Sequence, residues 1–160
     1  MQPESSGELA VRPAVPEDAP AIAGFQILMA RETEGMELDP DTVAQGVAAV
    51  FADRSKGQYF VAVTGEQSSR IAGCLLVTPE WSDWRNGTVL WIQSVYVVPE
   101  MRGRGVYRLL YEHMQARVAA SPALRGIRLY VDKRNTAAQG VYARLGMTRE
   151  HYELFEWMKE

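Results

Sequence analysis

Residues 88–118 read TVLWIQSVYVVPEMRGRGVYRLLYEHMQARV, and this stretch contains the change of period that decides the fold. Neighbouring positions are both apolar up to Val98, which is typical of a central strand covered on both faces. Beyond Gly105 the apolar residues recur at helical spacing as far as Val118. We therefore predict a long strand over 88–98, a tight glycine turn, and a helix.

Shorter patterns on either side predict further strands and helices. Asn86-Gly87 is a hairpin signal before the long strand, and Gly146 is a residue that commonly ends a helix. The expected strands cover 9–12, 58–64, 71–78, 88–98, 127–132 and 151–158, and the expected helices begin at Pro16, Asp41, Gly105 and Thr136. This order, β-α-α-β-β-β-α-β-α-β, predicts an α/β (α+β) domain with a mixed central sheet of about six to seven strands flanked by about four helices.

The composition is that of an ordinary single domain. The chain has 160 residues, 47% of them apolar, and a formal net charge of -3. A chain of this length fits one domain, which we place at 8–160 behind a flexible N-terminus, 1–7. The net charge provides no basic field for nucleic acid, so an anionic ligand must be held by a local cluster.

Cysteine use and hydropathy exclude further classes of protein. Cys74 is the only cysteine, which rules out an internal disulfide and a cysteine-based zinc site, and we predict no metal. Its apolar neighbours favour a small buried side chain over the alternative, a catalytic thiol. Because no apolar stretch reaches the ~18 residues of a membrane span and the N-terminus lacks a signal-peptide pattern, we expect a cytoplasmic protein without a membrane partner.

The glycine turn, Pro99 to Tyr107, is the first candidate site. It joins the end of a strand to the start of a helix, where N–H groups without helical partners favour an anion. Arg102, Arg104 and Arg108 add positive charge. The turn therefore predicts a bound phosphate or pyrophosphate, and the alternative is a plain turn with solvated arginines.

The helix that follows Asn135 is the second candidate. Asn135 suits a helix cap, and Ala138 and Tyr142 are four residues apart and share a face. Small residues at 137 and 138 would let a thin ligand pass beside the helix, with the Tyr142 hydroxyl near it. The alternatives are that Asn135 only caps the helix and that Tyr142 is a core aromatic.

In this order and spacing, the two motifs resemble those of the GNAT superfamily of acetyl-CoA-dependent N-acetyltransferases. The family's pyrophosphate loop, Gln/Arg-x-x-Gly-x-Gly/Ala, matches Arg102 and Gly105. Its Asn-x-x-Ala-x-x-x-Tyr-x-x-x-Gly-Phe pattern matches Asn135, Ala138, Tyr142 and Gly146. Two positions depart from these patterns: Tyr107 replaces Gly or Ala, so its side chain must point away from the cofactor, and Met147 replaces Phe.

The resemblance implies a single N-acetyltransferase domain that uses acetyl-CoA as co-substrate and acetylates a primary amine by direct attack in a ternary complex. The strand backbone would bind the pantetheine arm, the turn would hold the pyrophosphate, and Tyr142 would assist the leaving thiolate. The implied cofactor residues are Val95, Tyr96, Val97, Arg102, Gly103, Arg104, Gly105, Val106, Tyr107, Asn135, Ala138 and Tyr142. The resemblance also allows a homodimer, because many similar proteins are dimers.

The central strand has no carboxylate, so a proton acceptor must come from another segment. The acidic stretch 32–39 lies between the first two helices, in a loop that helps to cover the acceptor site in similar proteins. Glu32 or Glu34 could accept a proton through water, and the alternative is a solvated acidic loop. We favour packing for Trp91, whereas Trp81 and Trp84 either pack or line the acceptor pocket.

Other functions fit part of the same pattern. The first alternative is a non-catalytic acyl-CoA-binding or sensing domain on the same fold, and the second is an acyltransferase that uses a different acyl-CoA. A phosphate-binding module unrelated to CoA is disfavoured by the Asn135–Tyr142 helix. Amino acids, polyamine-like compounds, aminoglycosides and peptide amines all remain as acceptors, and the acidic stretch favours a small cationic amine.

Overall fold

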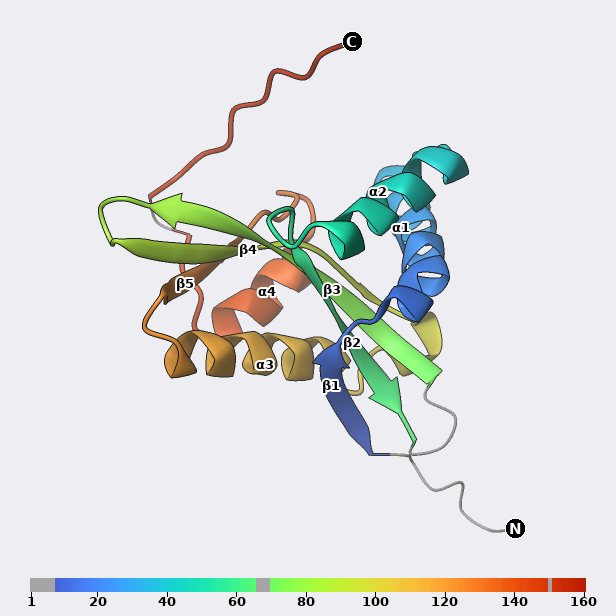
Figure 1. Ribbon diagram of the computed structural model, residues 1–160, viewed down its shortest axis with the longest axis horizontal. Helices are drawn as coiled ribbons and strands as arrows, with labels where there is room; N and C mark the ends of the chain where they lie inside the picture. Colours follow the sequence, from blue (N-terminus) through green and yellow to red (C-terminus); the bar gives the residue numbers. More distant parts are fainter. Residues whose placement is uncertain (1–7, 66–69, 150) are drawn as a thin grey trace. The chain divides into compact units, whose positions relative to one another are not determined.

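The computed structural model describes residues 8–65, 70–149 and 151–160, and the first compact unit of the chain ends at Leu129 (Figure 1). This unit contains a five-stranded sheet in the order β1-β2-β3-β4-β5. The strands up to β4 pair antiparallel, and β5 is parallel to β4, which confirms the predicted mixed sheet. The strand bounds are β1 (Leu9–Pro13), β2 (Gln58–Thr64), β3 (Arg70–Ser82), β4 (Gly87–Val97) and β5 (Leu124–Leu129).

Three α-helices of the first unit pack against the sheet. They are α1 (Ala19–Glu34), α2 (Pro40–Ala52) and α3 (Val106–Ala120), and short 3-10 turns, η1 (Pro16–Asp18) and η2 (Pro99–Met101), precede α1 and α3. The helices α1 and α2 lie together on one side of the sheet and α3 lies on the other (Figure 1). The helix predicted to begin at Pro16 therefore begins with the 3-10 turn η1. Proline suits this first turn, because the N–H that it lacks would have no partner within the helix.

Alternation along the strands sends neighbouring residues to opposite faces. Val61 and Cys74 are cross-strand partners and pack against α1 and α2 in one buried cluster, whereas the adjacent pair, Phe60 and Leu75, lies on the α3 side. The Phe60 ring packs on His113 of α3, with centroids 5.5 Å apart. Each fully buried apolar side chain of this kind contributes about 1.5–3 kcal/mol.

Cys74 is 1% exposed, and burial raises the pKa of its thiol to about 12. A thiol with this pKa is protonated at neutral pH and is a poor nucleophile. The structure therefore confirms the buried, inert side chain that the apolar run predicts.

The expected strand over 151–158 is wrong. Residues 151–160 form no strand, and Tyr152, Phe155 and Trp157 are 80%, 89% and 88% exposed. A strand is stable only beside a partner, and none of the described strands pairs with this segment. The sheet consequently has five strands in the described chain instead of about six to seven.

The second compact unit, Tyr130–Glu160, contains the helix α4 (Thr136–Arg144). A turn precedes this helix, because Asn135 donates its backbone N–H to the Asp132 carbonyl at 2.9 Å. The strand predicted over 127–132 is therefore displaced to Leu124–Leu129 in the first unit, and the predicted helix is confirmed. The flexible N-terminus predicted for 1–7 lies outside the described residues.

Candidate active site

The C-terminal half of β4 has an open edge. Pairing with β5 ends at Ile92 and Leu129, whereas β4 continues to Val97. The Val98 N–H donates to the Ala72 carbonyl of β3 at 2.9 Å. Because backbone groups alternate between the two edges of an antiparallel strand, Val95 and Val97 direct their N–H and C=O groups away from β3. These are the two backbone positions expected to bind an extended ligand.

A β-bulge interrupts β4 just before this open edge. Ser94 pairs with Leu76 and Ile92 pairs with Val77, so Gln93 is an extra residue without a partner in the register. A bulge bends a strand and increases its twist, which accounts for the divergence of β4 from β5. The polar pair Gln93-Ser94 within an apolar strand was the available sequence signal for this feature, and sequence reasoning missed it.

A hollow of ≈ 610 Å³ lies between the end of α1 and the open edge of β4. Its lining brings together five residues predicted from sequence: Glu32, Val95, Tyr96, Val97 and Arg102. Met29 and Thr33 complete the lining and were missed. Met29 lies three residues before Glu32 and four before Thr33, and both spacings make it a neighbour on the surface of α1. Glu34, the other predicted carboxylate, is the last residue of α1 and is not part of this lining.

Glu32 and Arg102 form an ion pair at the mouth of the hollow. The Arg102 Nη2 donates to Glu32 Oε2 at 2.7 Å, and its Nε donates to the Val97 carbonyl at 3.0 Å. The Tyr96 hydroxyl donates to Glu32 Oε1 at 3.3 Å, and the Arg102 guanidinium lies 5.5 Å from the centre of the Tyr96 ring. Arg102 holds the pKa of Glu32 below its usual range, so this carboxylate is ionised at neutral pH.

The glycine turn has the backbone conformation that its sequence predicts. Gly103 and Gly105 have φ values of 76° and 79°, in the left-handed region that favours glycine. Gly105 caps α3, and the Leu109 N–H donates to its carbonyl at 3.0 Å, which makes this the first bond of the helix. The N–H groups of the first turn precede that bond, in the part of an α-helix that supplies no acceptors of its own, so this end of α3 suits an anion.

Tyr107, the residue that departs from the family's loop, packs along its own helix. Its ring stacks on Tyr111 of α3, with centroids 6.4 Å apart. The Tyr107 ring therefore packs on a side chain of its own helix, while the Tyr107 backbone N–H stays at the helix start.

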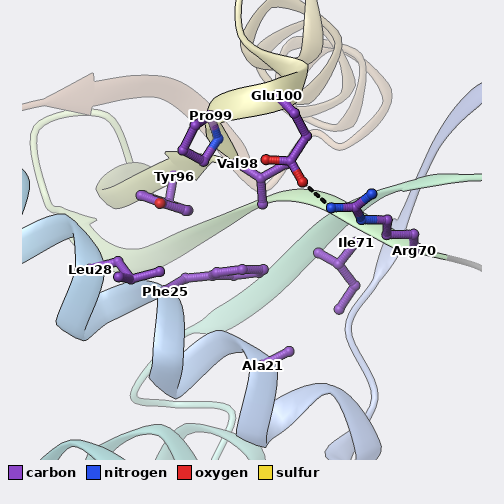
Figure 2. Close-up of a pocket in the computed structure, with 9 residues that line it drawn as sticks. All are labelled: Ala21, Phe25, Leu28, Arg70, Ile71, Tyr96, Val98, Pro99 and Glu100. Atoms are coloured by element: carbon purple, nitrogen blue, oxygen red, sulfur yellow. Dashed lines mark hydrogen bonds and ion pairs between the residues drawn. The ribbon is translucent and has the colours of Figure 1, made fainter.

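A second hollow, of ≈ 550 Å³, lies beside the first and shares Tyr96 with it (Figure 2). Phe25 of α1 stacks on Tyr96, with ring centroids 5.2 Å apart, and Tyr96 thus separates the two spaces. Apart from Tyr96 its lining is mainly apolar, and an ion pair between Arg70 and Glu100 stands at its rim (Figure 2). None of the residues predicted for the site other than Tyr96 lines this second hollow.

The predicted residues of the second compact unit belong to α4 and its N-terminal cap. The Asn135 Oδ1 accepts the Ala138 N–H at 3.1 Å, which confirms Asn135 as the cap of the helix. Tyr142 lies one turn beyond Ala138 and is half-buried. The structure therefore presents Asn135, Ala138 and Tyr142 on one helix, in the spacing that the sequence pattern requires.

Comparisons with known proteins identify the class to which this fold and site belong. The pattern of the acetyltransferase (GNAT) family matches residues 25–147. The crystal structure of a possible acetyltransferase from Clostridium difficile 630 is 38% identical to the chain, with a TM-score of 0.88, over 95% of this chain and 98% of that one. No curated protein sequence matches the chain at a significant level.

More distant structures share the fold alone. An aminoglycoside N-acetyltransferase, AAC(6')-Iy, solved in complex with CoA, is 15% identical with a TM-score of 0.76, and the match covers 99% of each chain. A ribosomal-protein-alanine N-acetyltransferase from Brucella melitensis biovar Abortus 2308 is 10% identical with a TM-score of 0.73, over 94% of this chain and 100% of that one.

The chain belongs to the GNAT family of acetyltransferases. It is therefore an acyltransferase, and acetyl-CoA is its co-substrate, as in the family. No helix in the described part of the chain is long and apolar enough to cross a membrane.

Proposed function

We propose that this acetyltransferase acetylates the primary amine of a small cationic molecule, by direct attack within a ternary complex. The observation that carries this proposal is the open edge of β4 at Val95 and Val97, which runs directly into the glycine turn at the start of α3. An extended arm that ends in a phosphate group fits a free strand edge followed by a helix N-terminus.

The residues of the first unit fit acetyl-CoA, which supplies an acyl group activated as a thioester. Val95 and Val97 offer backbone groups to the pantetheine arm, because both face away from β3. The amides from Gly103 to Tyr107 surround the phosphates, and Gly103 and Gly105 give the backbone the conformation that exposes those amides. The Arg102 N–H, which the resemblance included, donates to the Pro99 carbonyl at 3.3 Å instead. The resemblance assigns Asn135 and Ala138 of α4 to the same pantetheine arm.

Two groups of the chain act on the reacting atoms in this proposal. The Val95 N–H stabilises negative charge that develops on the carbonyl oxygen of the acyl group. The Tyr142 hydroxyl donates a hydrogen bond or a proton to the departing thiolate. Because a phenol has a pKa of about 10, above that of an ordinary thiol, stabilisation of the thiolate is as effective a role as full protonation.

Carboxylates at the end of α1 attract the amine, and one of them receives its proton. Glu32 provides a fixed negative charge in the wall of the hollow, since Arg102 lowers its pKa. Glu34 is the second candidate and accepts the proton through water. A cationic acceptor fits this charge, and the aminoglycoside N-acetyltransferase AAC(6')-Iy, which has the same fold, gives a precedent for such an acceptor.

The first experiment is thermal unfolding with and without acetyl-CoA, beside desulfo- and dephospho- analogues, followed by a screen of amines for acetylation. A ligand at 100 times its dissociation constant stabilises the native state by about 2.7 kcal/mol. A clear upward shift with subsequent turnover of an amine supports the proposal. Binding without turnover of any amine would favour the sensing domain, and the absence of a shift would refute the proposed cofactor site.

A further inference from the structure

A polar strip crosses the sheet on the side of α1 and α2, next to the bulge in β4. Its members come from three neighbouring strands: Thr78 and Glu80 of β3, Trp91 and Gln93 of β4, and Arg128 of β5. Thr78 is the cross-strand partner of Trp91. Thr78 and Glu80 share a face with Cys74, which belongs to the cluster packed under α1 and α2.

Glu80 is the centre of this strip. The Trp91 Nε1 donates to Glu80 Oε2 at 2.6 Å, and the Arg128 Nη1 donates to Glu80 Oε1 at 2.5 Å. The Gln93 Nε2 donates to the Thr78 hydroxyl at 2.9 Å beside it. Glu80 keeps 40% of its side-chain surface exposed. A carboxylate has about four lone-pair sites, so Glu80 can accept further donors from a ligand while it holds both of these partners.

Ser94 marks the other end of the strip, where the acyl group is transferred. Its Oγ is buried and has no hydrogen-bond partner among the described residues. Ser94 pairs with Leu76 and directly precedes Val95, whose N–H faces the open edge. From Leu76 to Glu80 the strand advances about 13 Å, at about 3.3 Å per residue. Glu80 therefore lies about that distance from the transfer point, on the same face of the sheet.

We propose that this strip binds the part of the acceptor that does not react, and that Glu80 is its specificity residue. The acceptor is an extended molecule that carries a second ammonium group about 13 Å from the reacting amine. The second ammonium donates to Glu80, whose side chain is 40% exposed. This inference rests on the proposed function, because it takes Val95 as the transfer point.

The test measures equilibrium binding, so that it does not depend on turnover. α,ω-Diamines of increasing length and 1-aminoalkanes of the same lengths are titrated by calorimetry into the complex with desulfo-CoA and into the chain without nucleotide. We expect the wild-type protein to prefer the diamine by about 10-fold or more at the length that spans the strip. The shortest diamines should show no preference, because they cannot reach Glu80.

Glu80→Gln should abolish the preference for the diamine, while its carboxamide oxygen still accepts the Trp91 N–H and preserves the fold. Glu112→Gln is the matched control. Glu112 is a carboxylate of α3 that is bonded to Arg108 at 2.7 Å, and its replacement removes the same charge far along the chain from the strip. The control should retain the preference.

A wild-type protein without a length-dependent preference would overturn the proposal, and so would a Glu80→Gln variant that keeps it. Loss of the preference in Glu112→Gln as well would also overturn it, because net charge would then be the cause. Failure of the proposed function has a different signature, since it would appear as an absence of binding by desulfo-CoA while the titrations without nucleotide still test Glu80.

Discussion

Gly105→Ala separates the backbone role of the glycine turn from its role in holding the cofactor. Gly105 has a φ of 79°, and a Cβ added there would meet no heavy atom within 4 Å. The cost in the free protein is therefore the strain of a left-handed alanine alone, about 1–2 kcal/mol. For a chain of this length, that cost lowers the melting temperature by about 2–8 °C.

The same substitution adds a methyl group where the phosphates of acetyl-CoA must approach the backbone. At a concentration that stabilises the wild-type protein by about 2.7 kcal/mol, a ten-fold loss of affinity leaves about 1.4 kcal/mol. We expect at least this loss, measured as the upward shift of the melting temperature on addition of acetyl-CoA. The corresponding wild-type shift is about 5–11 °C.

Gly35→Ala is the matched control for this experiment. Gly35 ends α1 with a φ of 62°, and an added Cβ there also meets no heavy atom within 4 Å. It should show a similar loss of stability without ligand and a full shift with acetyl-CoA. A Gly105→Ala protein that keeps the full shift would refute the assignment of the turn to the pyrophosphate, and one that loses no stability would refute the strain argument.

Further substitutions test other parts of the structure. Tyr142→Phe should lower kcat by about 100-fold or more with little change in the affinity for acetyl-CoA, and unchanged turnover would remove its role at the thiolate. Glu32→Gln should raise the KM for a cationic acceptor, measured from the dependence of rate on acceptor concentration. The pH–rate profiles of Glu32→Gln and Glu34→Gln test the proton acceptor, and profiles identical to the wild-type one would exclude both carboxylates from that role. Met114→Ala should cost about 2–5 kcal/mol in urea unfolding at unchanged m-value, because Met114 is fully buried. Asp18→Asn should lower the free energy of unfolding by about 2 kcal/mol at pH 7, because Arg12 lowers the pKa of Asp18 in the folded state. The difference in stability between wild type and variant should persist above a pH of about 4 and disappear at lower pH, as wild-type Asp18 is protonated. A difference that does not change with pH would contradict the ion pair.

Local signals made much of the first unit predictable from sequence. Gly105 and the hairpin residue Asn86, whose φ is 47°, stand at positions where few residue types are favourable, so the turns around β4 could be placed within about two residues. The resemblance alone pointed to the backbone of Val95 and Val97, and the open edge at these residues came only from the structure.

The features that the sequence did not predict depend on pairing between strands that are distant in the chain. Trp157 belongs to a segment with strand-like composition, yet a strand exists only where a partner supplies hydrogen bonds. Glu80 is distant in sequence from Trp91 and Arg128, and only the register of three strands brings their side chains together. Glu80 belongs to β3, so the sequence of the central strand β4, which has no carboxylate, gave no sign of it.

The open edge of β4 also affects how the protein behaves when no co-substrate is bound. Unpaired N–H and C=O groups along a strand are a template for another extended chain. A pantetheine arm at Val95 and Val97 occupies that template much as an added strand would. Bound co-substrate should therefore reduce self-association through this edge. Aggregation should begin in preparations from which acetyl-CoA has been removed during purification.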